Sequence, residues 1–204
     1  MDSTGRGGMG ADDAANEARV IADGERLAGE GIYLRLVEPG DCGEAYLSWL
    51  NDPKVSRFLE TRWREQTDAS IRDFVRAMRQ GASNYLFAIV RTNDDRHIGN
   101  VKLGAISPVH RYADVSYFIG SRDAWGTGIA TEAIRILTRF AFERVGLHRV
   151  QAVVNVGNAA SARALKRAGF AVEGLAMQKL WTGEGWSDEA SYGILRPLSD
   201  EEER

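Results

Sequence analysis

A glycine-containing turn within residues 122–132 carries the residue types that most clearly suggest chemistry in this 204-residue chain. Gly126 and Gly128 lack a Cβ, so the backbone around them can approach a ligand closely. Residues 113–119 have the composition of a strand, and apolar residues recur from Ala130 onward at the spacing of one helical face. Because the first turn of a helix leaves N–H groups unpaired, the turn predicts a pyrophosphate site. A tight strand-to-helix connection without a ligand is the alternative.

Two common nucleotide-binding motifs do not fit this turn. The Rossmann fingerprint needs a third small residue where Thr131 stands, and a Walker loop needs Gly-Lys-Ser/Thr, which this turn lacks. Neither type of nucleotide site is therefore expected.

The segment from Trp125 to Ala130 resembles the acetyl-CoA loop of the GNAT N-acetyltransferase superfamily, written Q/R-x-x-G-x-G/A. Trp125 stands where that pattern has Gln or Arg, and Trp-Gly-x-Gly-x-Ala-Thr-Glu-Ala looks like the subgroup containing ribosomal-protein N-terminal acetyltransferases. A second block, residues 155–161 followed by 166–170, resembles the N-x-x-S…K-x-G-F segment of the same subgroup. Two motifs in the right order are more specific than either alone.

This resemblance implies acetyl-CoA as the co-substrate. It implies that backbone groups of the loop hold the pyrophosphate, that the hydroxyls of Thr127 and Thr131 are extra donors, and that a splayed strand pairs with the pantetheine arm. Asn158 and Ser161 would touch CoA, although helix capping alone also explains Asn158. The implied CoA-binding residues are Phe118, Ile119, Trp125, Gly126, Thr127, Gly128, Ile129, Ala130, Thr131, Asn158 and Ser161.

The catalytic residues are less clear. Leu165 stands where many GNAT enzymes have a tyrosine that protonates the departing thiolate, so we rank Ser161 first for that role, ahead of water or an unassisted thiolate. Asp114 occupies the position of a strand carboxylate in the related subgroup and is the candidate base, with a surface charge as the alternative. Asn155 is a candidate for holding a water at the end of the next strand.

The acceptor is predicted from residues 49–63, where Trp-Leu-Asn-Asp-Pro-x-Val resembles GNAT proteins of bacterial amino-sugar and polysaccharide pathways. Trp49, Arg62 and Trp63 are the candidate substrate-binding residues, although Asn-Asp-Pro is also a strong helix stop. We favour a small primary amine, with an amino sugar nucleotide slightly ahead. The alternatives are a protein N-terminus or antibiotic amine, and a GNAT module that binds acyl-CoA without turnover.

Composition restricts the partners. A net charge of −3 and a pI near 5.7 argue against broad nucleic-acid binding, and no apolar run approaches the length of a membrane span. Cys42 is the single cysteine and the three histidines lack ligand spacing, so we expect neither a disulfide nor a metal site. We expect a cytoplasmic protein and keep a homodimer as an open expectation.

The predicted elements define one α/β domain over residues 29–198, with a GNAT-like mixed central sheet flanked by helices, between a disordered tail at 1–28 and a short acidic tail at 199–204. Asp41 and Glu44 predict a capping box at the first helix. In the next helix, periodicity places Ile71, Phe74, Val75 and Met78 on the core face.

Overall fold

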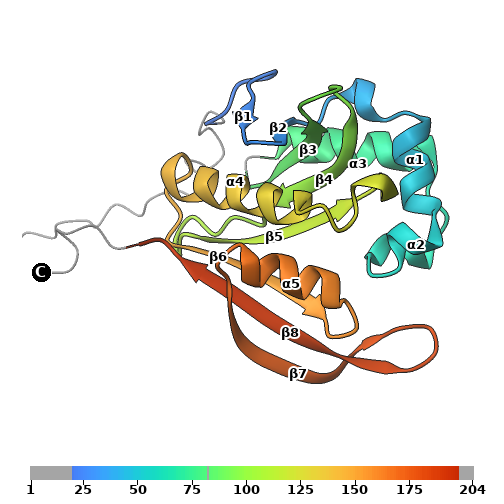
Figure 1. Ribbon diagram of the computed structural model, residues 1–204, viewed down its shortest axis with the longest axis vertical. Coiled ribbons are helices and arrows are strands. Elements are labelled where there is room, and N and C mark those ends of the chain that lie inside the picture. Colours follow the sequence, from blue (N-terminus) through green and yellow to red (C-terminus); the bar gives the residue numbers. More distant parts are fainter. Residues whose placement is uncertain (1–19, 82, 198–204) are drawn as a thin grey trace, which may run out of the picture.

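The computed structural model describes residues 20–81 and 83–197, which form one mixed sheet covered by helices on both faces (Figure 1). The eight strands lie in the order β1-β2-β3-β4-β5-β6-β8-β7. Their bounds are Leu27–Ala28 (β1), Ile32–Leu36 (β2), Tyr85–Arg91 (β3), His97–Leu103 (β4), Tyr112–Ile119 (β5), Arg149–Asn155 (β6), Ala171–Trp181 (β7) and Trp186–Leu195 (β8). All neighbours pair antiparallel except β5 and β6, which are parallel. The predicted single-domain α/β fold is confirmed.

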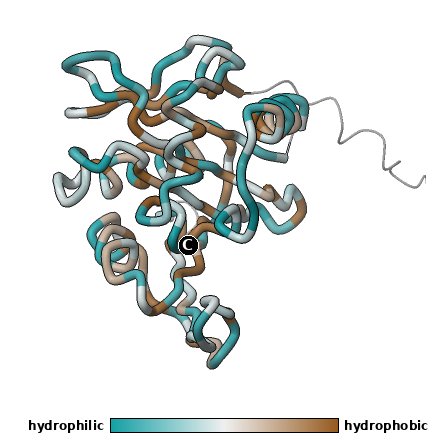
Figure 2. Tube along the Cα trace, turned by 90° about the vertical axis from the view of Figure 1, so that its right-hand side faces the viewer, coloured by the Kyte–Doolittle hydropathy of each residue, from teal (hydrophilic) through white to brown (hydrophobic). Residues whose placement is uncertain are grey.

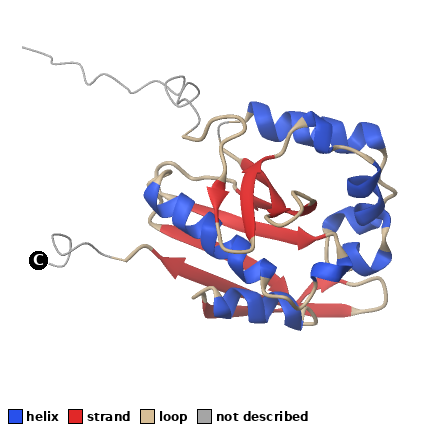
Figure 3. Ribbon diagram, turned by 45° about the horizontal axis from the view of Figure 1, so that its top comes forward, coloured by secondary structure: helices blue, strands red, loops and turns tan. Residues whose placement is uncertain are grey.

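The helices form two layers (Figure 3). One layer packs α4 and α5 against the first face of the sheet, and the other packs α1 and α3 against the opposite face. The helix bounds are Glu44–Asn51 (α1), Pro53–Ser56 (α2), Asp68–Gln80 (α3), Ile129–Glu143 (α4) and Ala159–Arg167 (α5), and the short 3-10 helices are Pro39–Asp41 (η2), Glu60–Trp63 (η3) and Arg122–Ala124 (η4). Hydrophobic segments run through the middle of the trace, where the sheet lies (Figure 2).

Helix α4 follows the expected pattern. Its residues at helical spacing, among them Ile134, Leu137 and Phe140, are buried against the sheet. Phe140 meets the rings of Tyr85 and Phe87 edge to face at centroid distances of 5.2 and 5.3 Å. These contacts fix the helix on the sheet, so the position of its first turn is set by the core.

The feature that matters most for a ligand is the short pairing of β5 with β6. The two strands are in register only from Tyr112↔Arg149 to Asp114↔Gln151. Beyond that point β6 continues to pair with β8, and β5 with β4, while the facing edges of β5 and β6 separate. The sheet is therefore split open over the second half of β5.

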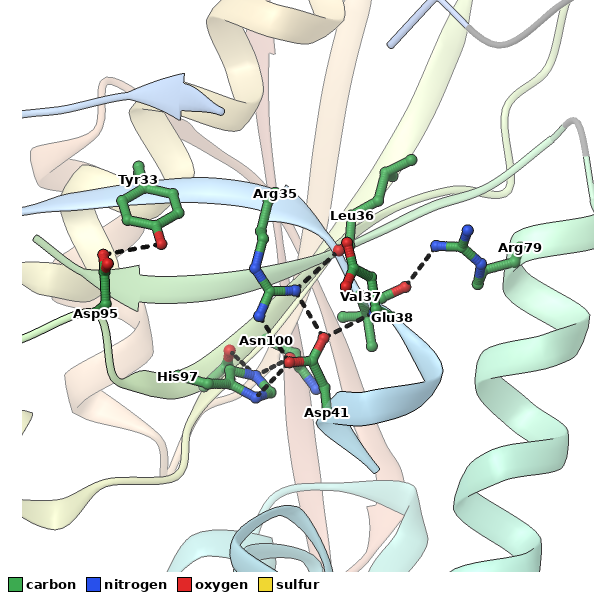
Figure 4. Close-up of polar contacts among 11 residues, drawn as sticks. Tyr33, Arg35, Leu36, Val37, Glu38, Asp41, Arg79, Asp95, His97 and Asn100 are labelled. Carbon is green, nitrogen blue, oxygen red and sulfur yellow. Dashed lines mark hydrogen bonds and ion pairs between the residues drawn. The ribbon is translucent and has the colours of Figure 1, made fainter. Parts of the chain in front are cut away.

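A buried polar cluster lies on the α1 and α3 face (Figure 4). Arg35 donates two hydrogen bonds of 2.7 Å to the carboxylate of Asp41, which also accepts from the backbone N–H of Glu38. His97 places Nδ1 3.9 Å from Asp41 Oδ1 and donates from Nε2 to Asn100 Oδ1 at 2.7 Å. We refer to these groups as the Arg35–Asp41–His97 cluster.

Burial and pairing act in opposite directions on the carboxylate of this cluster. Burial alone raises the pKa of Asp41, but the hydrogen bonds from Arg35 and from the Glu38 N–H outweigh it and hold that pKa below 3.8. Burial lowers the pKa of His97 below 6.5, although the hydrogen bond to Asn100 opposes this shift. The cluster therefore contains an ionised pair beside a neutral imidazole.

Two predictions about the helices differ from the structure. The predicted capping box between Asp41 and Glu44 does not form, and Gly43 is the N-cap of α1. The Asp41 side chain instead binds Arg35 and forms a capping box with Glu38. Phe74 is predicted to face the core but is 43% exposed. The buried face of α3 is centred on Ile71 and Val75 and does not extend to Phe74.

The predicted tail over 1–28 is too long at its carboxyl end. Ile21 is buried, β1 pairs with β2, and Arg144 forms an ion pair with Glu25, so residues 20–28 belong to the domain. Residues 1–19 and the predicted acidic tail lie outside the described residues. Within the described part of the chain, no helix is long and apolar enough to cross a membrane.

Candidate active site

The turn between β5 and α4 leaves its backbone facing open space. Gly126 and Gly128 have φ angles of 78° and 92°, in the left-handed region that favours glycine. A Cβ built on either residue would meet no atom within 4 Å. Gly128 is also the N-cap of α4, so the first unpaired N–H groups of a 15-residue helix begin at this opening. The turn has the shape and dipole direction of an anion cradle.

Two side chains fix the turn. Trp125 donates from Nε1 to the carbonyl of Ile119, the last residue of β5, at 2.8 Å. The Oγ1 of Thr127 donates to the carbonyl of Ala124 at 2.7 Å, which uses the one hydrogen that this hydroxyl carries. Thr127 therefore holds the turn in shape, and the sequence-based expectation that its hydroxyl donates to a ligand does not fit this geometry.

A cleft of about 530 Å³ begins at this turn and follows the opening between β5 and β6. Five segments line it: α2 with the residues after it, β5, the turn with the start of α4, β6, and α5. Of the residues predicted to bind CoA, all but Thr127 line the cleft: Phe118, Ile119, Trp125, Gly126, Gly128, Ile129, Ala130, Thr131, Asn158 and Ser161.

Tyr117 and Ser161 meet across the cleft. The Tyr117 Oη lies 2.7 Å from Ser161 Oγ and 3.3 Å from the carbonyl oxygen of the same serine. Burial raises the pKa of Tyr117, and the hydrogen bond to Ser161 only partly opposes this. Leu165, at the family's tyrosine position, is fully buried.

The sequence predicted only that the splayed strand, which contains Tyr117, pairs with the pantetheine arm, and it gave no role to the Tyr117 hydroxyl. The available signal was that Tyr117 is the polar-tipped member of an inward-facing set that includes Val115 and Ile119.

The two asparagines have local structural roles. Asn158 Oδ1 accepts from the backbone N–H of Ser161 at 3.2 Å and thereby caps α5. Asn155 Oδ1 accepts from the N–H of Gly157 at 2.8 Å and from Ser187 Oγ at 3.1 Å. Both residues line the cleft, so their structural bonds orient them there.

Asp114, the predicted base, lies outside the cleft. It is the last residue of β5 in register with β6, and its Oδ1 accepts from Gln151 Nε2 at 3.0 Å. It is not among the residues that line the cleft, because the strands separate only after it. The geometry gives the predicted base a role in closing the paired end of the two strands.

The predicted acceptor residues also lie elsewhere. Trp49 is 9% exposed and packs directly on the backbone of Gly120, where an added Cβ would lie 2.1 Å from its ring. Arg62 donates to the carbonyls of Arg57 and Trp181 and covers the ring of Trp63 at 4.3 Å. These bonds tie the segment after α2 to the β7–β8 hairpin. None of the three predicted residues lines the cleft: Trp49 is a core residue, Arg62 supports the hairpin, and Trp63 is 49% exposed outside the cleft.

The charged groups that do line the cleft are all basic: Lys54, Arg57, Arg163 and Arg167. Within the described part of the chain, the lining contains no Asp or Glu. Arg163 and Arg167 lie on α5, whereas Lys54 and Arg57 lie on or just after α2. Arg57 covers the ring of Phe58, which approaches Gly157 at the end of β6. Sequence reasoning did not single out these four basic residues.

Comparisons with known proteins find relatives that are described as N-acetyltransferases. YjcK of Bacillus subtilis (strain 168), described as a probable N-acetyltransferase, is 38% identical over 114 residues, which cover 55% of this chain and 62% of that protein. The chain thus spans less than two thirds of YjcK. YoaA of the same organism, described as an uncharacterized N-acetyltransferase, is 30% identical over 174 residues, which cover 84% of this chain and 97% of YoaA.

Solved structures share the fold. RimL, a ribosomal L7/L12 alpha-N-protein acetyltransferase in complex with coenzyme A, has a TM-score of 0.75 at 19% identity, covering 84% of this chain and 98% of that chain. The spermidine N-acetyltransferase from Vibrio cholerae in complex with CoA and spermine has a TM-score of 0.73 at 20% identity, covering 82% and 96%. A family model for the acetyltransferase (GNAT) domain matches residues 32–171. The chain therefore belongs to the GNAT family of N-acetyltransferases.

Proposed function

We propose that this protein transfers the acetyl group of acetyl-CoA directly to the primary amine of a small molecule that also carries an anionic group, such as an amino sugar nucleotide. The observation that carries the proposal is the glycine turn at the start of α4, which opens into the split between β5 and β6. The acceptor class is inferred from the charge of the cleft.

The donor half of the cleft fits the parts of CoA. The backbone from Gly126 to Thr131 would hold the pyrophosphate, because its N–H groups start a helix and no Cβ fills the approach. The edge of β5 around Phe118 and Ile119 would pair with the amide groups of the pantetheine arm, since β6 leaves this edge after Asp114. Arg163 and Arg167 would add positive charge near the phosphates.

The reaction itself needs little from side chains. The amine nitrogen forms a bond to the carbonyl carbon, the carbon–sulfur bond breaks, and the sulfur leaves with the electron pair as a thiolate. One N–H proton is released to solvent or to the sulfur. An α-amine or similar amine of pKa about 7.7–8.0 is partly neutral at pH 7, so a strong base is not required. This suits a cleft from which Asp114 is absent.

The acceptor half favours an anion over a polyamine. Lys54 and Arg57 contribute positive charge, and no carboxylate in the described lining offsets it. A polycation such as spermidine would meet like charge there, whereas a phosphate or carboxylate would gain a charge-assisted, often bidentate pair with Arg57. Arg57 thus takes the part that sequence reasoning assigned to Arg62.

The decisive experiment measures release of free thiol from acetyl-CoA with three acceptors: an amino sugar nucleotide, spermidine and an N-terminal peptide. We expect turnover with the first. Arg57→Gln should raise the KM for this acceptor roughly tenfold or more, because a hydrogen bond to a charged group contributes about 1.5–3 kcal/mol. The KM for acetyl-CoA should stay within about twofold.

Arg76→Gln is the matched control, because it removes the same charge from the exposed surface of α3, where Arg76 pairs with Asp73. It should leave both KM values unchanged. Preferential turnover of spermidine or of the peptide would refute the anionic acceptor. An Arg57→Gln effect on acetyl-CoA alone would instead assign Arg57 to the donor.

A further inference from the structure

We propose that Tyr117 is a positioning residue for the leaving group, acting through Ser161, so that the two hydroxyls together stabilise the sulfur of CoA as it departs. The inference rests on the proposed function, because it concerns the same cleft. It assigns a role to a tyrosine on β5, a different element from the α5 position at which Leu165 stands.

The geometry connects two elements that the split in the sheet would otherwise leave apart. Tyr117 reaches from β5 to the first turn of α5, where its Oη lies 2.7 Å from Ser161 Oγ. Ser161 is itself fixed, since its backbone N–H donates to Asn158 Oδ1 at 3.2 Å. Both side chains line the cleft. The backbone of Ser161 is thus fixed by Asn158, and its hydroxyl is hydrogen-bonded to Tyr117.

Two hydrogen-bond arrangements satisfy these distances. In the first, Ser161 donates to Tyr117 Oη, and Tyr117 donates to the Ser161 carbonyl oxygen at 3.3 Å. In the second, Tyr117 donates to Ser161 Oγ, which leaves the serine hydrogen for an acceptor in the cleft. Negative charge on the sulfur favours the second arrangement, because hydrogen bonds to an ionised group are stronger. Tyr117 therefore permits Ser161 to turn toward the sulfur.

Relative acidity shows that the pair works by hydrogen bonding rather than by net proton loss. A thiol of pKa about 8.5 is more acidic than a phenol of pKa about 10, so the thiolate does not take the proton of tyrosine. Burial raises the pKa of Tyr117 further, which keeps this donor protonated throughout the working pH range. Loss of its hydroxyl should thus lower the rate without removing a limb of the pH profile.

The test uses the binary complex with CoA and needs no acceptor. The thiol of bound CoA is titrated by the ultraviolet absorbance of its thiolate. Tyr117→Phe should raise the pKa of the bound thiol by about one unit, because one hydrogen bond to the charged form is weakened. Ser161→Ala should raise it at least as much, and the double variant should match Ser161→Ala alone. In a separate assay with the amino sugar nucleotide as acceptor, turnover of Tyr117→Phe should fall roughly tenfold, at all pH values alike.

Two controls separate positioning from a structural role. The affinity for desulfo-CoA, which lacks the sulfur, should be the same in wild type and Tyr117→Phe. Tyr112→Phe removes a hydroxyl from the paired end of the same strand and should change neither the thiol pKa nor the rate.

Three results would overturn the inference: an unchanged thiol pKa in Tyr117→Phe, effects of the two single variants that add, or a loss of desulfo-CoA affinity. Failure of the wild-type protein to bind CoA would refute the proposed function as well. Normal CoA binding with an unchanged thiol pKa would refute this inference alone.

Discussion

The cleft between β5 and β6 and the Arg35–Asp41–His97 cluster are both polar regions in an apolar sheet, but they are built from different parts of the chain. The start of the cleft presents backbone, at glycines whose added Cβ would meet nothing within 4 Å. In the cluster, side chains hold one another through hydrogen bonds of 2.7 Å. The first region is open toward something outside the chain, whereas the charged groups of the second are paired with each other.

We therefore expect the glycine turn to govern ligand binding and the Arg35–Asp41–His97 cluster to govern stability. A backbone cradle tolerates changes of neighbouring side chains, but it is sensitive to a change in backbone conformation. A buried ion pair tolerates little, because removing one partner leaves the other charged group without compensation. Variants in the two regions should therefore affect different measurements.

The largest expected effect is on stability, from Asp41→Asn. Arg35 would then remain with its guanidinium 20% exposed and without a carboxylate, and the backbone N–H of Glu38 would lose a charged acceptor. Breaking such a buried pair costs about 3–5 kcal/mol. Denaturant unfolding should show this loss, while the CoA affinity of the folded protein stays unchanged.

Asp73→Asn is the matched control, because its ion pair with Arg76 is exposed on both sides and should contribute little. If Asp41→Asn weakened CoA binding without changing stability, the separation between the two regions would be lost.

A second test replaces Gly128 by Val. The left-handed φ of 92° costs a non-glycine residue roughly 1–2 kcal/mol, and the new side chain would enter the approach to the turn. We expect CoA affinity to fall by roughly a hundredfold or more, as judged by calorimetry, in a protein that still folds.

Gly146 provides the control, since it has a φ of 75° and equally open surroundings but lies beyond the far end of α4. Gly146→Val should show a similar cost in stability with normal CoA affinity. Unchanged affinity in Gly128→Val would refute the cradle.

The smallest effect is a pH dependence that sharpens the description of the cluster. Because burial lowers the pKa of His97 below its unfolded value of 6.5, the unfolded state takes up a proton first as pH falls. Stability should decline as pH drops below about 6.5. The pKa of Asp41 is lowered from 3.8, so its contribution should be lost only at a lower pH.

His97→Gln should flatten the decline between neutral pH and about pH 5 in denaturant unfolding measured at several pH values. A slope that persists in this variant would show that other groups cause it.

Local patterns in the sequence predicted the fold and the glycine turn at which the cleft begins. The apolar stripe of α4, the glycines before it and the cap at Asn158 each depend on neighbours within a few residues, and each appears in the structure. The glycine turn could be located for the same reason, because its geometry depends on one turn and one helix start.

The positions of Trp49, Arg62 and Asp114 relative to the cleft could not be predicted in this way, because they depend on contacts between distant segments. Trp49 looks available in the sequence, yet Gly120, 71 positions later, gives it a place in the core. The Arg62 guanidinium donates a hydrogen bond to the carbonyl of Trp181, 119 residues away, which holds it outside the cleft. The register that keeps Asp114 out of the cleft is set by Gln151 on another strand. Periodicity and composition carry no information on such pairings.

The Arg62 contact has a consequence for protein engineering. By donating to carbonyls on both sides, Arg62 joins the segment after α2 to the β7–β8 hairpin, so two stretches far apart in sequence behave as one part. A chimera that takes the hairpin from a relative should therefore need residues 57–63 from the same donor. Exchange of either piece alone would disturb the bond between the residue 62 side chain and the carbonyl of residue 181, which joins the two pieces.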